Sequence, residues 1–247
     1  MKLKEGIYEQ VISNKIHEEI KNRENEINIQ KEEIEKEEAK IVLSKYLQEV
    51  TKKSLNLMKN KDLNKQIELC NQIINYLSTQ VEDEEIKENN IHKNGEILLS
   101  IEEKLNKSKI KNNNIRPITP ISQSYLFTNS NNEPDLINEL KREIASSDSI
   151  DILVSFIRWS GLRLIKDELI EHTKTKKLRI ITTSYMGASE FRAIKFLSQL
   201  PNTEIKISYD TQRTRLHAKS YMFNRNTGFT TAYIGSSNIS KDAMTTG

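Results

Sequence analysis

Apolar residues recur at every third or fourth position through the first hundred residues, and this spacing predicts helices. The region from Leu3 to Leu105 holds no proline and only two glycines, so few residues in it disfavour a helix. The predicted helices span Glu5 to Glu26, Ile27 to Lys53, Leu55 or Asp62 to Gln80, and Glu96 to Leu105. The charged stretch QKEEIEKEEAK is either a solvated helix face or an arm used for assembly, and VEDEEIKENNIHKNG predicts a polar connection.

The pattern changes after Leu105. The stretch NKSKIKNNNIRPITP, residues 106–120, is rich in Asn and Lys and carries two prolines, which is typical of a linker. It separates a helical N-terminal region, residues 1–105, from a second domain, residues 121–247.

Short β-branched apolar runs in the second domain predict buried strands. These runs are Asp148 to Ile157, Lys177 to Tyr185 and Thr203 to Asp210. Helical stretches, Gly161 to Thr173 and Ala188 to Leu200, separate them, and this alternation predicts a mostly parallel sheet with helices on both faces. Two further strands, around Leu216 to Phe223 and Thr230 to Ile234, predict a hairpin, and a last helix is expected to begin in SSNISKDAM. The predicted fold class is therefore α/β.

The composition indicates the cellular location of the protein and the class of its partner. No apolar run approaches the roughly 18 residues that a membrane span needs, and the N-terminus lacks the apolar core of a signal peptide, so we expect a cytoplasmic protein without a membrane partner. Cys70 is the only cysteine, which excludes an intrachain disulfide and a thiolate cluster for zinc. Residues up to about 115 are slightly acidic and the remainder is about five units basic, an asymmetry that favours a polyanionic partner for the C-terminal part.

Cations gather around one histidine in TRLHAKSYMF. In an extended strand the side chains of Arg213, Arg215, His217 and Lys219 project from one side. Like charges so placed repel unless an anion sits among them. The following turn, Gly235-Ser236-Ser237-Asn238, is expected at a helix start, where free amides favour a phosphate. The pattern predicts a phosphate site with one nucleophile.

His217-Ala-Lys219 followed by Gly235-Ser236-Ser237-Asn238 resembles the HKD motif of the phospholipase D superfamily. The blocks ITPISQSYLFTN, SFIRWSGLRLI and ITTSYMGAS, together with the motif region, are similar to the phospholipase-D-like domain at the N-terminus of large bacterial DEAD/DEAH-type helicases. The resemblance covers roughly Pro117 to Gly247.

This resemblance implies a metal-independent phosphodiesterase that needs no cofactor. His217 would attack the phosphodiester and form a phosphohistidine, and Lys219 would stabilise the oxygens that gain charge. Asn238 and Ser236 match the element that binds the same phosphate, with Ser237, Arg213, Arg215 and Asn224 as further substrate-binding candidates. The substrate is expected to be nucleic acid, and DNA in particular, in a helicase-linked phage-defence or restriction system.

Two departures from the family pattern bear on catalysis. Asn224 stands where the family has an aspartate, so the charge of that residue is missing. The sequence ends at Gly247 where related chains continue, so the domain is expected to be incomplete at its C-terminal end, and an acidic residue that orients the histidine in many relatives would lie past Gly247. The alternative function is therefore a DNA-binding or assembly module in which catalysis is weak or lost.

The chain holds only one His-X-Lys sequence. This chemistry uses two histidines, one as nucleophile and one as general acid, so the pattern predicts a homodimer with the active site on its two-fold axis. A helicase motor in the same or a partner chain is a further expected partner.

Plainer interpretations stay open beside these. His217 alone could be a structural histidine, Arg213 and Arg215 could be edge-strand charges, and Trp159 suits core packing as well as base stacking. Lipid hydrolysis has little support, because no amphipathic membrane-facing segment accompanies the site.

Overall fold

The computed structural model describes residues 3–23, 25–58, 62–101, 115–127, 135–210 and 216–245. The chain divides into two compact units, Met1–Leu99 and Ser100–Gly247. Most of the predicted linker, from position 106 to position 114, lies outside the described residues.

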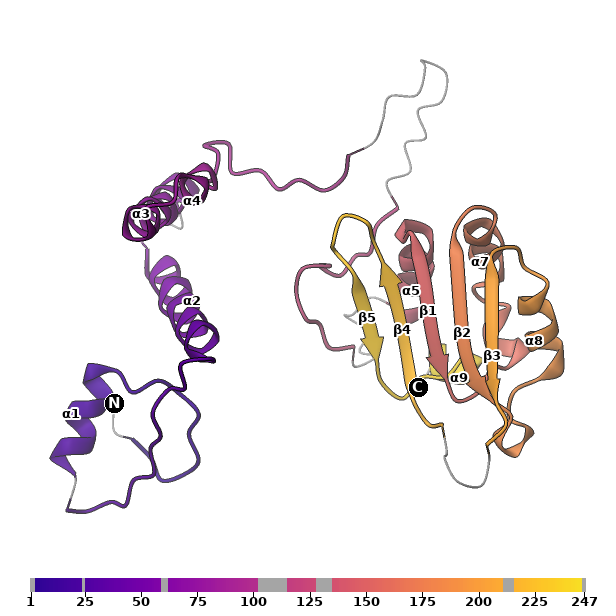
Figure 1. Cartoon of the computed structure of the whole chain (residues 1–247), viewed down its shortest axis with the longest axis horizontal. Helices are drawn as coiled ribbons and strands as arrows, with labels where there is room; N and C mark the ends of the chain where they lie inside the picture. Colours follow the sequence, from indigo (N-terminus) through magenta and orange to yellow (C-terminus); the bar gives the residue numbers. More distant parts are fainter. Residues whose placement is uncertain are drawn as a thin grey trace. The chain divides into compact units, whose positions relative to one another are not determined.

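The N-terminal unit is helical, as the apolar spacing predicts (Figure 1). Its helices are α1 (Asn14–Asn22), α2 (Ala39–Leu57), α3 (Leu63–Val81) and α4 (Glu84–Glu88). Helix α3 matches the span expected from Asp62 to Gln80, whereas the helices expected at Glu5 to Glu26 and Ile27 to Lys53 are shorter. The residues between positions 27 and 38 were expected to be helical and are not, because their three apolar side chains, Ile27, Ile29 and Ile34, include no two that are three or four residues apart. The described part of the helix predicted at Glu96 to Leu105 is not helical either, whereas α4 forms inside the predicted polar connection.

Helix α2 buries none of its residues within the described structure. Its apolar side chains follow helical spacing and stay exposed, among them Leu43, Leu47 and Val50. Most of the stability of helices in proteins comes from packing of an apolar face, so we expect another surface to cover this stripe.

The C-terminal unit is an α/β domain, which confirms the predicted fold class (Figure 1). Its helices are α5 (Leu136–Ser146), α6 (Trp159–Leu162), α7 (Lys166–Thr173), α8 (Phe191–Ser198) and α9 (Lys241–Thr245). Its strands are β1 (Ser149–Val154), β2 (Lys177–Thr183), β3 (Thr203–Ser208), β4 (Lys219–Asn224) and β5 (Thr231–Ile234), in the order β3-β2-β1-β4-β5. Strands β1, β2 and β3 are parallel, and β4 runs antiparallel to both β1 and β5.

The core lies between one face of this sheet and a single layer of helices (Figure 1). Ile150 and Ile152 on β1 and Phe223 on β4 share the buried face, whereas their neighbours along each strand point away. The expectation of helices on both faces is wrong for the described residues. The reason is topological: the strands are added in one direction, from β1 to β2 to β3, and right-handed crossovers then place both connecting helices on the same side.

Helix α5 was not predicted, although its pattern was present. Ile137, Leu140 and Ile144 are spaced three and four residues apart and are buried, and the Asp135 carboxylate accepts a hydrogen bond from the backbone N–H of Ile137. Asp135 ahead of this periodic run is the signal that could have identified the helix.

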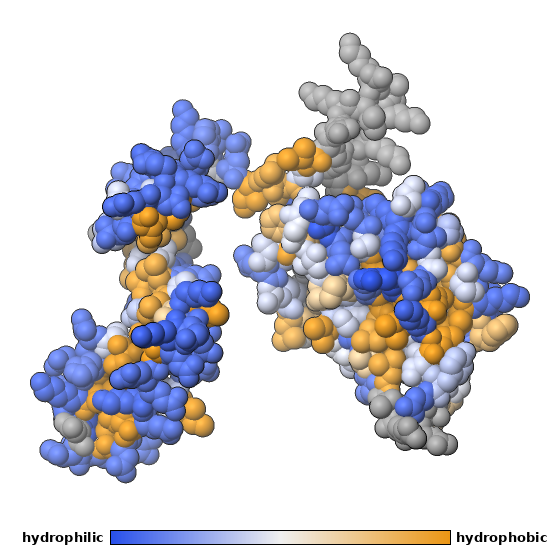
Figure 2. Space-filling model, viewed as in Figure 1, coloured by the Kyte–Doolittle hydropathy of each residue, from blue (hydrophilic) through white to orange (hydrophobic). Residues whose placement is uncertain are grey.

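The other face of the sheet is open among the described residues (Figure 2). Ile181 on β2 and its register partner Leu153 on β1 lie in an apolar patch over the half of the sheet where β1 and β2 end. Towards the beginnings of these strands the face is polar, because Asp151 pairs with Arg179 and accepts a hydrogen bond from Asn224.

Candidate functional site

Antiparallel pairing places Lys219 at the carboxyl end of β1, where it is the register partner of Val154. The carboxyl edge of parallel strands is where α/β sheets commonly bind ligands. Strand β4 begins at Lys219, not near Leu216 as predicted, so His217 lies in the connection that precedes the strand. Lys219 is 8 % exposed, whereas His217 is exposed to solvent.

The predicted nucleophile and the predicted cation are in contact. The Nζ atom of Lys219 lies 3.0 Å from Nε2 of His217, and it also donates to the backbone carbonyl of His217 at 3.0 Å. A lysine ammonium has only donors, so the ring nitrogen that faces it presents its lone pair. The pair therefore places a lone-pair nitrogen and a positive charge together at the carboxyl edge of the sheet.

Asn238 is buried, at 6 % exposure, and joins two loops. Its side-chain oxygen accepts the backbone N–H of Phe156, the second residue after β1, at 3.2 Å. One residue further on, Ile239 forms an isolated bridge with Ile157. Gly161 allows this close approach, since a Cβ atom there would lie 2.5 Å from the backbone nitrogen of Ser240.

Ser236 and Ser237 lie in the same loop, directly after β5. The backbone N–H of Gly235 donates to the carbonyl of Lys219 at 3.3 Å, which keeps the loop beside the histidine and lysine pair. Ser236 is exposed, and the carbonyl of Ser237 accepts the hydroxyl of Tyr221 at 2.9 Å. The helix start expected at these serines is wrong, because α9 begins at Lys241 and has five residues. The free backbone amides of a helix N-terminus are therefore not supplied by Ser236 and Ser237.

The structure does not bring Asn224 to this site. It is the last residue of β4, at the opposite end from Lys219, and its side-chain amide donates to Asp151 at 3.1 Å on the open face of the sheet. Asn224 lies about 16 Å from Lys219 along the strand, at the usual rise per residue. Asn224 supports the sheet and lies away from the predicted phosphate site. Arg213 and Arg215 lie outside the described residues.

Hydroxyl groups that sequence reasoning missed stabilise the carboxyl ends of β1 and β2. Thr182 donates to the carbonyl of Ser155 at 3.3 Å, and Ser189 donates to the carbonyl of Thr183 at 3.0 Å. Single Ser and Thr residues carry no sequence signal of their own, so only the register of the strands identifies this cluster.

Trp159 packs at the edge of the core. Its ring lies edge-on to Phe196 at 5.5 Å, and the guanidinium of Arg192 covers it at 4.2 Å from the ring centre. This geometry agrees with the core-packing interpretation.

His172, near the end of α7, is buried. Its two ring nitrogens face the carbonyls of Ile144 and Lys177, and burial lowers the pKa of the ring. It has a structural role between α5 and β2.

Part of the chain is similar to a known protein family. Residues 134–247, less than half of the chain, match the family model described as the NgoFVII restriction endonuclease N-terminal PLD domain. The C-terminal unit is thus similar to a phospholipase-D-like nuclease domain. The match supports a nuclease-type phosphodiesterase, and the α/β sheet with its layer of helices is consistent with the phospholipase-D-like fold.

Among solved structures, NucT from Helicobacter pylori aligns with a TM-score of 0.34 and 22 % sequence identity, over 46 % of this chain and 72 % of its own. None of the curated proteins compared with the chain matches it.

No group of three or more His, Cys, Asp or Glu side chains among the described residues is arranged to hold a metal ion. None of the helices in the described ranges is long and apolar enough to cross a membrane.

Proposed function

We propose that the phospholipase-D-like unit is a metal-independent nuclease that cleaves DNA through a phosphohistidine on His217. The observation that carries this proposal is the 3.0 Å contact between His217 Nε2 and Lys219 Nζ, in the part of the chain that matches a restriction endonuclease domain. A phosphodiester bound there would draw the Lys219 ammonium onto its oxygens and free the histidine lone pair for attack.

The reaction has two steps. His217 Nε2 forms a bond to phosphorus as the bond to one ester oxygen breaks, and a second histidine gives that leaving oxygen its proton. Water then attacks the phosphohistidine, the P–N bond breaks, and the second histidine takes the proton of the water. Lys219 stabilises the charge on the phosphoryl oxygens in both steps.

The second histidine comes from a second copy of the chain in this proposal. His172 is unsuited because it is buried and held by two carbonyls, and the chain holds a single His-X-Lys sequence. A two-fold axis close to His217 would bring both active-site histidines to one phosphate. The resulting homodimer is the form in which we expect activity.

The remaining predicted residues have supporting roles. Ser236 and Ser237 would bind phosphate oxygens, and Arg213 and Arg215 would contact the DNA backbone. Asn238 would act through the loop that it fastens to Phe156. The helicase-like resemblance of the sequence favours a nuclease module of a cytoplasmic phage-defence or restriction system that works with a helicase motor.

An inactive DNA-holding module is the alternative, and Asn224 is the residue that motivates it. Because Asn224 lies at the far end of β4, the aspartate that it replaces would not have charged the site directly. The placement thus removes one argument against catalysis.

The test is cleavage of end-labelled single- and double-stranded DNA in EDTA. Wild type, His217→Ala and the control His92→Ala are compared, with molar mass measured by light scattering on the same samples. His92 is an exposed histidine of the N-terminal unit. We expect cleavage by a dimeric wild type and by the control, and none by His217→Ala. Salt-dependent binding with no cleavage by wild type would establish the alternative.

A further inference from the structure

A cavity of about 680 Å³ opens beside the proposed phosphate site. It lies between the segment from Thr119 to Phe127, strand β5, and helices α5 and α9. The Gly235–Ser237 loop forms one of its borders, and Gly235 is hydrogen-bonded to Lys219. The cavity and the histidine and lysine pair are therefore neighbours across a single loop. The segment that closes the cavity precedes the residues that match the family model.

Aromatic rings form much of its wall. Tyr125 lies 5.2 Å from Phe127 between ring centres, edge to face, and Phe127 lies 5.6 Å from Tyr233. Tyr125 is 48 % exposed, so part of its ring is available to a ligand. Rings in this arrangement offer flat apolar surfaces to another flat ring.

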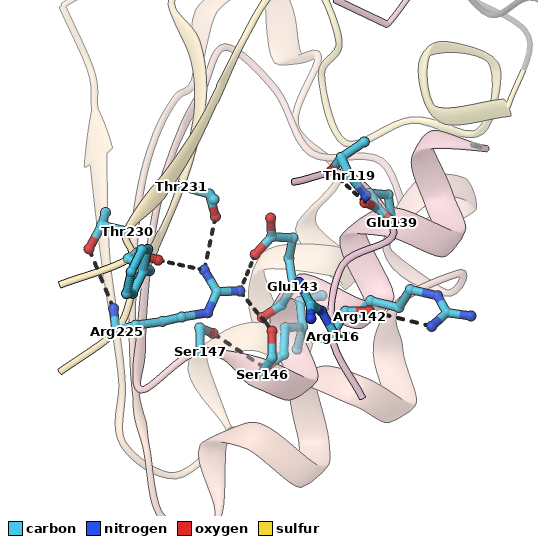
Figure 3. Close-up of polar contacts among 12 residues, drawn as sticks. Arg116, Thr119, Glu139, Arg142, Glu143, Ser146, Ser147, Arg225, Thr230 and Thr231 are labelled. Carbon is cyan, nitrogen blue, oxygen red and sulfur yellow. Dashed lines mark hydrogen bonds and ion pairs between the residues drawn. The ribbon is translucent and has the colours of Figure 1, made fainter. Parts of the chain in front are cut away.

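Two fully buried carboxylates on α5 hold the opposing walls in place (Figure 3). Glu139 accepts the backbone N–H and the hydroxyl of Thr119, at 2.6 and 2.5 Å, and so fastens the Thr119–Phe127 segment. Glu143 accepts the hydroxyl of Tyr233 at 2.9 Å, and burial together with this carboxylate raises the pKa of that tyrosine. These bonds hold Thr119 and the Tyr233 ring in place without a ligand, which lowers the cost of binding.

We propose that this cavity receives an unpaired nucleobase next to the phosphate held at the Gly235–Ser237 loop. Its volume lies in the range of small-ligand sites, and bases stack readily on tyrosine and phenylalanine rings. A base inside a duplex cannot reach such a pocket unless it leaves the stack, at a cost of a few kcal/mol. The inference rests on the proposed function and adds a substrate class: single-stranded or locally unpaired DNA.

The test uses binding, so that it does not depend on catalysis. The ligands are a set of short single-stranded oligonucleotides, each with 2-aminopurine at a different position. The protein is the His217→Ala variant, which is expected to leave the oligonucleotides uncleaved. Stacking on Tyr125 should quench the fluorescence at one or two positions, and the same oligonucleotide in a duplex should be quenched much less.

Three substitutions in this background make the test specific. Tyr125→Leu should abolish the quench and weaken binding roughly 5- to 100-fold, as expected for the loss of one base stacking on a ring. Tyr125→Phe keeps the ring and should retain both. Phe229→Leu removes an exposed ring in the turn between β4 and β5 that does not line the cavity, and it should change neither. Circular dichroism checks that each variant is folded.

The outcomes separate the two proposals. Binding without a quench at any position, or a quench that survives Tyr125→Leu, would overturn the base pocket and leave the nuclease proposal standing. Absence of binding to every oligonucleotide would overturn both. Cleavage by wild type that is equally fast on duplex and single strand would also contradict the pocket.

Discussion

Arg225→Leu is expected to destabilise the C-terminal unit strongly. The guanidinium of Arg225 is buried, at 7 % exposure, and pairs with Glu143, which is fully buried (Figure 3). It also donates to Ser146 at 2.7 Å and to Phe229 and Thr231 at 3.1 Å. This one side chain joins the turn of the β4–β5 hairpin to helix α5.

The size of the loss in unfolding free energy follows from the buried charge that the substitution leaves without its partner. Without Arg225, the Glu143 carboxylate stays buried with the Tyr233 hydroxyl as its remaining donor among the hydrogen bonds described. Removing one partner of a buried ion pair costs about 3–5 kcal/mol, a large share of the roughly 5–15 kcal/mol by which a domain is stable. The double variant Arg225→Leu/Glu143→Leu removes the stranded charge and should recover much of that loss.

Urea unfolding followed by tryptophan fluorescence measures the effect. Trp159 is the only tryptophan and packs at the core of the C-terminal unit, so unfolding of the N-terminal helices is silent. Arg179→Leu is the matched control, because Arg179 makes a solvent-exposed pair with Asp151 on the open face, and the loss of such a pair should change the stability little. A loss in Arg225→Leu no larger than the control, or a double variant less stable than the single one, would refute the reasoning.

Three further predictions follow from other contacts. Gly161→Ala should lower both the stability and the rate of DNA cleavage, because its Cβ would collide with the backbone of Ser240, close to the Gly235–Ser237 loop. Unfolding and cleavage equal to those of wild type would contradict this close packing. Arg179 holds the pKa of Asp151 below its usual 3.8, so the pair stabilises the fold above about pH 4 and the benefit is lost as the pH falls further. Urea midpoints of wild type and Arg179→Leu should therefore converge at acid pH, and a constant gap would exclude the linkage. If α2 covers its apolar stripe with a second copy of the chain, Leu47→Cys should form an intermolecular disulfide on mild oxidation, since Leu47 is near the middle of the helix. The variant is made in a chain whose native cysteine, Cys70, is replaced by serine. Monomers only would show that the stripe packs against another surface.

The strands were the most predictable elements. Runs such as KLRIITT and TEIKIS are short and rich in β-branched residues, and they form β2 and β3 with bounds close to those expected. Helix was overestimated between positions 27 and 38, where the apolar residues lack helical spacing. Helix α5 has only 11 residues, so its apolar spacing extends over about three turns and is a weaker signal than that of a long helix.

The amino-acid sequence by itself determined the α/β class, the helical N-terminal unit and the candidates His217, Lys219, Ser236 and Asn238, because local periodicity and short motifs encode these features. Only the tertiary structure decided which candidates meet. Antiparallel pairing of β4 with β1 puts Lys219 at the carboxyl edge and Asn224 about 16 Å away at the other end. The one-sided helix layer and the aromatic cavity depend likewise on contacts between residues far apart in the chain, which no local pattern records.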